Sequence, residues 1–112
     1  MRASASVNLV TRLRHRRALR ALLRAHYETP WPESVERGLD FGEIDPVMAD
    51  ADIYGWAVAS LNGDLNQDDW RRLSALIDRV ERSIPVLPEA GRDYFNRLAK
   101  LGRSAVEFRF NN

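Results

Sequence analysis

The most constraining feature of this 112-residue chain is the spacing of large apolar residues between Gln67 and Ile84. These residues recur every three or four positions, which places them on one face of an α-helix, and charged residues fill the other faces. The apolar positions are Trp70, Leu73, Leu76, Ile77, Val80 and Ile84. Because a helix with one apolar face must bury it against another element, the pattern predicts a packed helical domain.

Helix-capping and helix-breaking residues divide the rest of the chain into three more predicted helices. The first runs from about Val7 or Thr11 to Glu28, just before a Pro-Trp-Pro sequence that ends it. The second spans Pro46 to Leu61, with Asp45 as its N-cap. The last spans Glu89 to about Phe108. Short connections between the last three helices favour antiparallel neighbours.

Each of these helices carries its own candidate core residues. They are Leu19, Leu22, Leu23 and His26 in the first helix, Val47, Ala51, Tyr54, Val58 and Leu61 in the second, and Tyr94, Phe95, Leu98, Leu101, Ala105 and Phe108 in the last. We therefore predict an all-α, single-domain bundle of about four helices over residues 1–112. It would consist of a basic helix at 1–28, a long acidic loop at 29–45 and a three-helix core at 46–108. Trp31 is expected to fasten the loop to the bundle.

Composition excludes several classes of protein. The absence of cysteine rules out disulfides, thiol catalysis and thiolate metal sites. No apolar run approaches the roughly 18 residues of a membrane span, so we expect no membrane contact. The first 27 residues are rich in arginine and free of acids, which is typical of a mitochondrial transit peptide. We nevertheless expect them to belong to the mature fold of a cytoplasmic protein.

Residues 62–73 superficially match a calcium-binding loop, because oxygen-bearing side chains alternate from Asn62 to Asp68. However, Gln67 stands where the loop needs a glycine, and Leu73 stands where it needs a bidentate glutamate. Neither of the two histidines, His15 and His26, follows a glutamate at the Glu-x-x-His spacing of di-metal bundles. The sequence therefore predicts a helix connection here, with no metal and no cofactor.

Few residues in the chain are candidates for catalysis. His26 is a possible general base, but it shares a helix face with Leu19 and Leu23, so we expect a partly buried, hydrogen-bonded histidine. The serines of the predicted helices have no nearby base, and no glycine-rich phosphate loop is present. We therefore predict no catalytic residues and no enzymatic activity.

The formal net charge of +1 conceals a strong segregation of charge along the chain. Residues 1–27 carry seven arginines and no acid, whereas residues 28–69 carry eleven acids and Arg37 as their only base. A four-residue repeat of arginines indicates a basic ridge on the first helix, formed by Arg12, Arg16, Arg20 and Arg24. The ridge can contact phosphates of a nucleic acid, or pair internally with the acidic segment.

The acidic segment supports a different hypothesis. A dense carboxylate surface attracts a basic protein and steers its approach, and an exposed tryptophan can anchor it. The candidate partner-binding residues are Glu43, Asp50, Asp52 and Trp56.

The run from Phe41 to Gly55, which reads FGEIDPV-x-x-DAD-x-x-G, resembles a group of small helical bacterial proteins without an assigned function. The likeness extends over about residues 17–102 and includes a Leu-Pro-Glu turn before Tyr94 and Phe95. It implies no catalytic residues. Similarity to toxin-immunity proteins is one of size and charge alone.

The leading hypothesis is a non-enzymatic protein-binding module, for example an immunity or inhibitor protein, that holds a basic partner such as a toxin through its acidic surface. The alternative is a nucleic-acid-binding regulator that uses the arginine ridge. A third arrangement is a homo-oligomer in which the basic helix of one copy docks on the acidic segment of another.

Overall fold

The structure, a computed structural model, describes the backbone of residues 2–110 and the side chains of residues 9–110. Its four α-helices are α1 (Arg2–Glu28), α2 (Pro46–Leu61), α3 (Gln67–Ser83) and α4 (Arg92–Phe110). Two short 3-10 helices, η1 (Ile84–Val86) and η2 (Glu89–Gly91), connect α3 to α4. Within the described residues the fold is all-helical, as predicted, and the only β-type pairing is one isolated bridge between Phe41 and Ile44.

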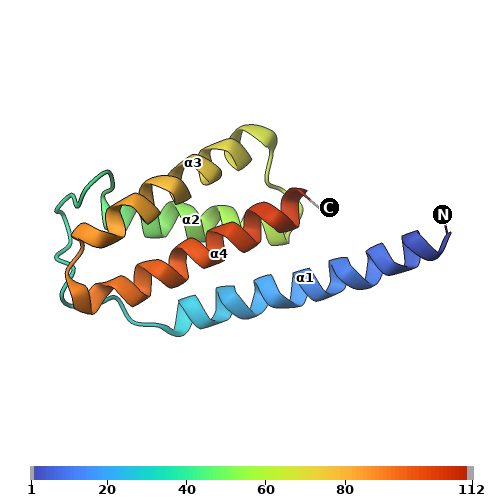
Figure 1. The fold of residues 1–112 in the computed structure, drawn as a ribbon, viewed down its shortest axis with the longest axis horizontal. Helices are drawn as coiled ribbons and strands as arrows, with labels where there is room; N and C mark the ends of the chain where they lie inside the picture. Colours follow the sequence, from blue (N-terminus) through green and yellow to red (C-terminus); the bar gives the residue numbers. More distant parts are fainter. Residues whose placement is uncertain (1, 111–112) are drawn as a thin grey trace.

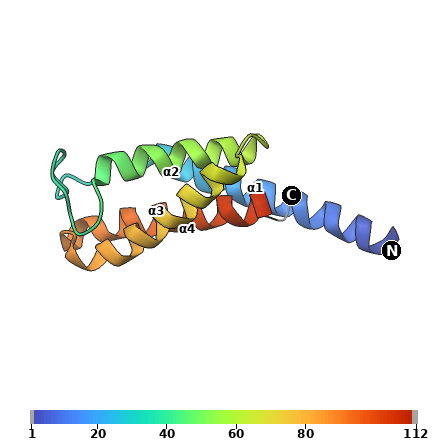
Figure 2. The same ribbon diagram turned by 90° about the horizontal axis from the view of Figure 1, so that it is seen from above.

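The helices run up and down in sequence order, each antiparallel to the one before it (Figure 1). α4 lies at the centre and packs against α1, α2 and α3. The N-terminal part of α1 extends past the ends of the other helices, as both views show (Figures 1 and 2). The molecule is elongated for this reason, with extents of 52 × 27 × 21 Å.

The predicted core faces of α1, α3 and α4 are confirmed. On α1, Leu19, Leu23 and His26 are buried and Leu22 is half-buried against the core, and all six candidate residues of α4 are buried. On α3 the predicted face is buried or half-buried along its whole length. Leu9, Val10 and Leu13, which lie outside the predicted stripe of α1, are about half exposed.

The predicted core face of α2 is wrong. The side chains that α2 buries are Pro46, Ala49, Ile53, Ala57 and Ser60, whereas the expected stripe from Val47 to Leu61 lies on a flank of the helix. Besides Pro46, Ile53 is the one large side chain of this face that is fully buried, and it fits because Gly102 of α4 lies opposite it, whereas Ala49, Ala57 and Ser60 are small. The Ser60 hydroxyl donates to the Ala105 carbonyl at 2.7 Å, which satisfies it inside this contact.

Residues 29–45 connect α1 to α2 and are tied to the bundle at several points. Trp31 packs edge-on against Phe95 and donates its indole N–H to the Val35 carbonyl at 2.8 Å, so its expected role as a fastener is confirmed. The backbone N–H of Glu43 donates to the Ser83 hydroxyl at 2.9 Å.

Candidate functional site

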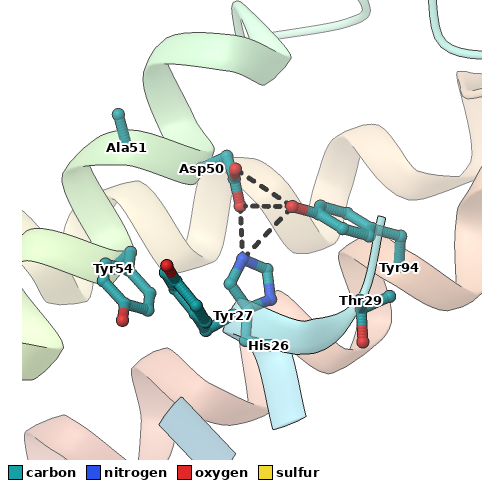
Figure 3. Close-up of a pocket in the computed structure, with 7 residues that line it drawn as sticks. All are labelled: His26, Tyr27, Thr29, Asp50, Ala51, Tyr54 and Tyr94. Carbon is teal, nitrogen blue, oxygen red and sulfur yellow. Dashed lines mark hydrogen bonds and ion pairs between the residues drawn. The ribbon is translucent and has the colours of Figure 1, made fainter. Parts of the chain in front are cut away.

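A cluster of three polar side chains joins three helices near one end of the bundle. His26 comes from the core face of α1, Asp50 from α2 and Tyr94 from α4, and they point toward one another (Figure 3). His26 Nε2 lies 2.6 Å from Asp50 Oδ1, and the Tyr94 hydroxyl donates to both Asp50 oxygens at 3.0 Å. His26 and Tyr94 are buried, and the Asp50 side chain is 23% exposed. The prediction of a buried, hydrogen-bonded His26 is confirmed.

The chemistry of the cluster assigns a donor to each bond. Burial raises the pKa of Tyr94 above the ordinary value of a phenol, and the nearby Asp50 carboxylate raises it further. The phenol therefore stays neutral and donates. Because an ionised carboxylate only accepts hydrogen bonds, the His26 nitrogen that faces Asp50, Nε2, carries a proton.

The other ring nitrogen of His26 makes no hydrogen bond within the described residues, where every buried side-chain nitrogen and oxygen has a partner. Nδ1 must therefore be in contact with solvent. His26 lines an open pocket of about 260 Å³, and the other lining residues are Tyr27, Thr29, Asp50, Ala51, Tyr54 and Tyr94 (Figure 3). The cluster is consequently accessible from outside through this pocket.

Of the arginine ridge predicted on α1, Arg12, Arg20 and Arg24 are exposed and Arg16 is half-buried, and the ridge is not straight. Four residues advance a helix by slightly more than one turn, so each step of the repeat rotates by about 40° around the axis. Arg12 and Arg16 line a hollow beside Leu61, and Arg16 donates to the Leu61 carbonyl at 2.9 Å. Arg20 and Arg24 line a second hollow together with Arg17, which the sequence pattern did not single out.

Within the described residues these arginines form no ion pair, although Glu28 lines the same hollow as Arg17, Arg20 and Arg24. Between residues 9 and 110, no carboxylate oxygen lies within 4.0 Å of a guanidinium nitrogen on α1. The ion pairs found in this part of the chain are His26–Asp50, Arg72–Asp69, Arg82–Glu43, Arg103–Asp78 and Arg103–Glu81. The acidic segment thus leaves the basic helix unneutralised at contact distance.

The four residues predicted to bind a basic partner do not form one patch. Asp50 and Asp52 are two positions apart on α2, which turns their side chains about 200° from each other. Asp50 faces His26 on α1, whereas Asp52 and Trp56 line a groove of about 470 Å³ toward α3. Asp50 is therefore separated from the other three.

Glu43 lies near that groove and is already paired. Arg82, which lines the groove, donates to both carboxylate oxygens of Glu43 at 2.7 and 3.0 Å, and this bonding lowers the pKa of Glu43. Arg72 and Arg79 line the groove as well. The surface around Asp52 and Trp56 has mixed charge as a result, and Trp56 is half-buried against the core.

The sequence could not reveal that Asp50 and Tyr94 belong with His26. The sequence pattern indicates a surface carboxylate at Asp50 and a core aromatic residue at Tyr94. The two residues lie 24 and 68 positions from His26 in the chain. Only the packing of α1, α2 and α4 brings them together. The one available signal was the polar His26 on an apolar helix face, because a buried polar group needs a partner.

The residues of the apparent calcium loop serve as a helix connection, as predicted. Gly63 adopts a positive φ of 76° after α2, and Asn66 caps α3 by accepting the Asp69 N–H at 2.8 Å. The described residues include no group of three or more histidines and acids arranged to hold a metal ion. In the same part of the chain, none of the helices combines the length and hydropathy that crossing a bilayer requires.

Comparisons of the chain with protein-family models, with curated proteins and with solved structures found no match, so no residue role is carried over from another protein.

Proposed function

We propose that the chain is a non-enzymatic binding protein whose helix α1 holds a polyanion, namely the phosphate backbone of a nucleic acid. The observation that carries this proposal is the set of exposed α1 arginines without a carboxylate within 4.0 Å. Guanidinium groups bind phosphate oxygens in a planar, two-pronged geometry, and each phosphate neutralised releases counterions. A helix that carries several such groups along its length suits the regular spacing of a phosphate backbone.

The shape of the molecule supports the same proposal. The N-terminal part of α1 extends beyond the bundle, so a partner can reach it from several sides (Figure 2). Arg12, Arg20 and Arg24 are all exposed beside the bundle, Arg12 next to the end of α2 and the other two farther along α1. The winding of these positions around the helix suits a backbone that curves around α1 better than one that runs straight along it.

The test is the salt dependence of binding to a labelled DNA duplex and a labelled single-stranded RNA. We expect the triple variant Arg12→Gln, Arg20→Gln and Arg24→Gln to reduce the slope of log K against log salt by about one for each arginine removed. Arg16 is left unchanged because it also holds the Leu61 carbonyl.

The matched control is Arg71→Gln, Arg79→Gln and Arg97→Gln, which removes the same charge from exposed positions on α3 and α4. The control should keep the slope of the unmodified protein. If the two triple variants reduce the slope of log K against log salt equally, only net charge matters, and the proposed role of α1 is contradicted. Absence of binding at low salt would also refute the proposal.

A second candidate function is the binding of a basic protein, as in an immunity or inhibitor protein. Its support is that seven carboxylates of residues 28–69 neither form an ion pair nor cap a helix within the described chain: Glu28, Glu33, Glu36, Asp40, Asp52, Asp64 and Asp68. Asp52 and Trp56 share a groove, which offers a carboxylate beside an aromatic surface. Asp50 is left out, because its oxygens are bonded to His26 and Tyr94.

This candidate predicts that Asp52→Lys abolishes retention of a partner, whereas Glu107→Lys, the same charge reversal at an exposed position on α4 outside the acidic segment, does not. The measurement is capture from a host lysate on the immobilised protein, eluted with increasing salt. A single stoichiometric protein held by the unmodified chain and lost only with Asp52→Lys would support the candidate. Equal retention by both variants would contradict it, and recovery of the chain itself would indicate the homo-oligomer instead.

A further inference from the structure

We propose that the pocket beside His26, Asp50 and Tyr94 binds a primary ammonium group carried on a short apolar stem. This site is separate from the arginine surface of α1 and from the groove of Asp52 and Trp56. The proposal depends on the composition of the pocket wall and on how the hydrogen bonds of the cluster are used.

The charge of the pocket favours a cation. Asp50 is the only carboxylate among its seven lining residues, and no arginine or lysine lines it. The α1 arginines line other hollows on the helix. Among the lining side chains the one permanent charge is therefore negative, and the cation that acts on Tyr94 from outside the lining is Arg37.

Asp50 retains acceptor capacity after its internal bonds are made. It accepts one hydrogen from His26 Nε2, and the single hydroxyl hydrogen of Tyr94 is shared between its two oxygens. An ionised carboxylate offers about four acceptor positions. Since the side chain is 23% exposed, a ligand N–H can reach the unused positions.

His26 and Thr29 supply further acceptors. Because Nε2 carries the proton donated to Asp50, Nδ1 is the ring nitrogen on the solvent-accessible side, and it accepts a hydrogen bond whenever the imidazole is neutral. The Thr29 hydroxyl donates to the Ala25 carbonyl at 2.6 Å, which leaves the oxygen of that hydroxyl free to accept. An ammonium group has three hydrogens to donate, and the pocket lining offers acceptors on three residues.

Aromatic rings make up much of the remaining wall. Tyr27, Tyr54 and Tyr94 all line the pocket, and the ring centroids of Tyr54 and Tyr94 lie 5.9 and 4.9 Å from that of His26. Faces of aromatic rings attract cations and pack against methylene groups. The volume of about 260 Å³ lies just below the range of roughly 300–1,000 Å³ that is typical of ligand pockets, which limits the ligand to a small one.

The experiment compares three probes of one carbon skeleton: butylammonium, 1-butanol and butyrate. Binding is monitored at neutral pH through the NMR chemical shifts of His26 and of the tyrosine rings. We expect saturable shifts with butylammonium and an affinity at least about ten-fold above that of 1-butanol, because a charged hydrogen bond replaces a neutral one. Equal affinities for the three probes, tighter binding of butyrate, or no saturable shift with butylammonium would each overturn the proposal.

Variants locate the binding. Asp50→Asn should lower the affinity for butylammonium by about ten-fold or more, whereas Glu28→Gln, which removes the same charge from a neighbouring hollow, should leave it unchanged. Tyr27→Ala provides a second variant that does not depend on the cluster, because this side chain is 80% exposed, and it should weaken binding several-fold. Unchanged affinity in Tyr27→Ala and in a folded Asp50→Asn would refute the site.

A last probe distinguishes a free amine from a side chain of a protein partner. Nα-acetyl-lysine amide carries the same butylammonium group on a peptide backbone. Affinity equal to or above that of butylammonium would support the site and identify a lysine side chain as its occupant. Weaker binding would support the site with a free amine as its ligand.

Discussion

A Cβ atom at position 102 would lie 2.7 Å from both Cγ1 and Cδ1 of Ile77 and 3.3 Å from Ile53. Rotation of the terminal methyl group of Ile77 cannot relieve this contact, because Cγ1 is as close as Cδ1. Gly102 therefore sets how closely α2 and α3 approach α4. Gly55 on α2 is not needed for close packing, because a Cβ atom there would meet nothing within 4 Å.

These two glycines form a matched pair for measuring the cost of overpacking. We expect Gly102→Ala to lower the free energy of unfolding by about 1–2 kcal/mol, because strain in the core outweighs the better helix propensity of alanine. Gly55→Ala should raise it by about 0.5–1 kcal/mol, since only propensity and backbone entropy change. Urea denaturation of both variants measures the two effects, and a stabilised Gly102→Ala would show that the helices can separate at little cost.

At the same scale, His26 shows how much of a residue's environment can be predicted from its position in the sequence. Its place on an apolar face predicted burial, and burial predicted a hydrogen-bond partner. The identity of that partner was not predictable, because any polar residue of three other elements could have filled the role. The partner acid, Asp50, was instead predicted to face outward with Glu43 and Asp52.

Among the elements, α2 owes its start to local sequence. The Asp45 carboxylate accepts the N–H groups of Val47 and Met48 at 3.0 and 3.3 Å, and Pro46 occupies the first turn. Both features were predicted from the Asp-Pro pair. The same helix shows the limit of such patterns, because Ile53 is the one large apolar side chain on its buried face besides Pro46, and the other positions are alanines and a serine that a search for large apolar side chains passes over.

We expect Asp45→Ala to lower the free energy of unfolding by about 1 kcal/mol, because two backbone donors at the start of α2 lose their acceptor. Asp64→Ala, at an exposed position between α2 and α3, should change it by less than about 0.5 kcal/mol. Chemical denaturation of both variants provides the measurement. A change in Asp45→Ala no larger than in Asp64→Ala would mean that water replaces the cap at no cost.

At the scale of the whole molecule, the separation of charge follows from the order of the elements. The arginine-rich helix is the first one, and its ridge arginines lie beside the bundle, where Arg12 and Arg16 line a hollow at the end of α2 and the carboxylate that lines the second hollow is Glu28. The ion pairs between described residues instead join α3 to α4, α3 to the segment before α2, α1 to α2, and residues within α3. The proposed salt-dependent binding is a property of this arrangement as a whole.

The sequence by itself determined that there are four main helices, where α2, α3 and the connection between them begin and end, and which faces of α1, α3 and α4 are buried. It placed the start of the first helix too late, at Val7 or Thr11 instead of Arg2, and the start of the last one too early, at Glu89 instead of Arg92, because Glu89–Gly91 forms a 3-10 turn. Periodicity, prolines and capping residues act through neighbours in the chain, so a single sequence contains their effects. The tertiary structure alone decided the buried face of α2, the meeting of His26, Asp50 and Tyr94, and the lack of ion pairs at the described α1 arginines. These features depend on distances between residues far apart in the chain, which are set by how closely the helices pack.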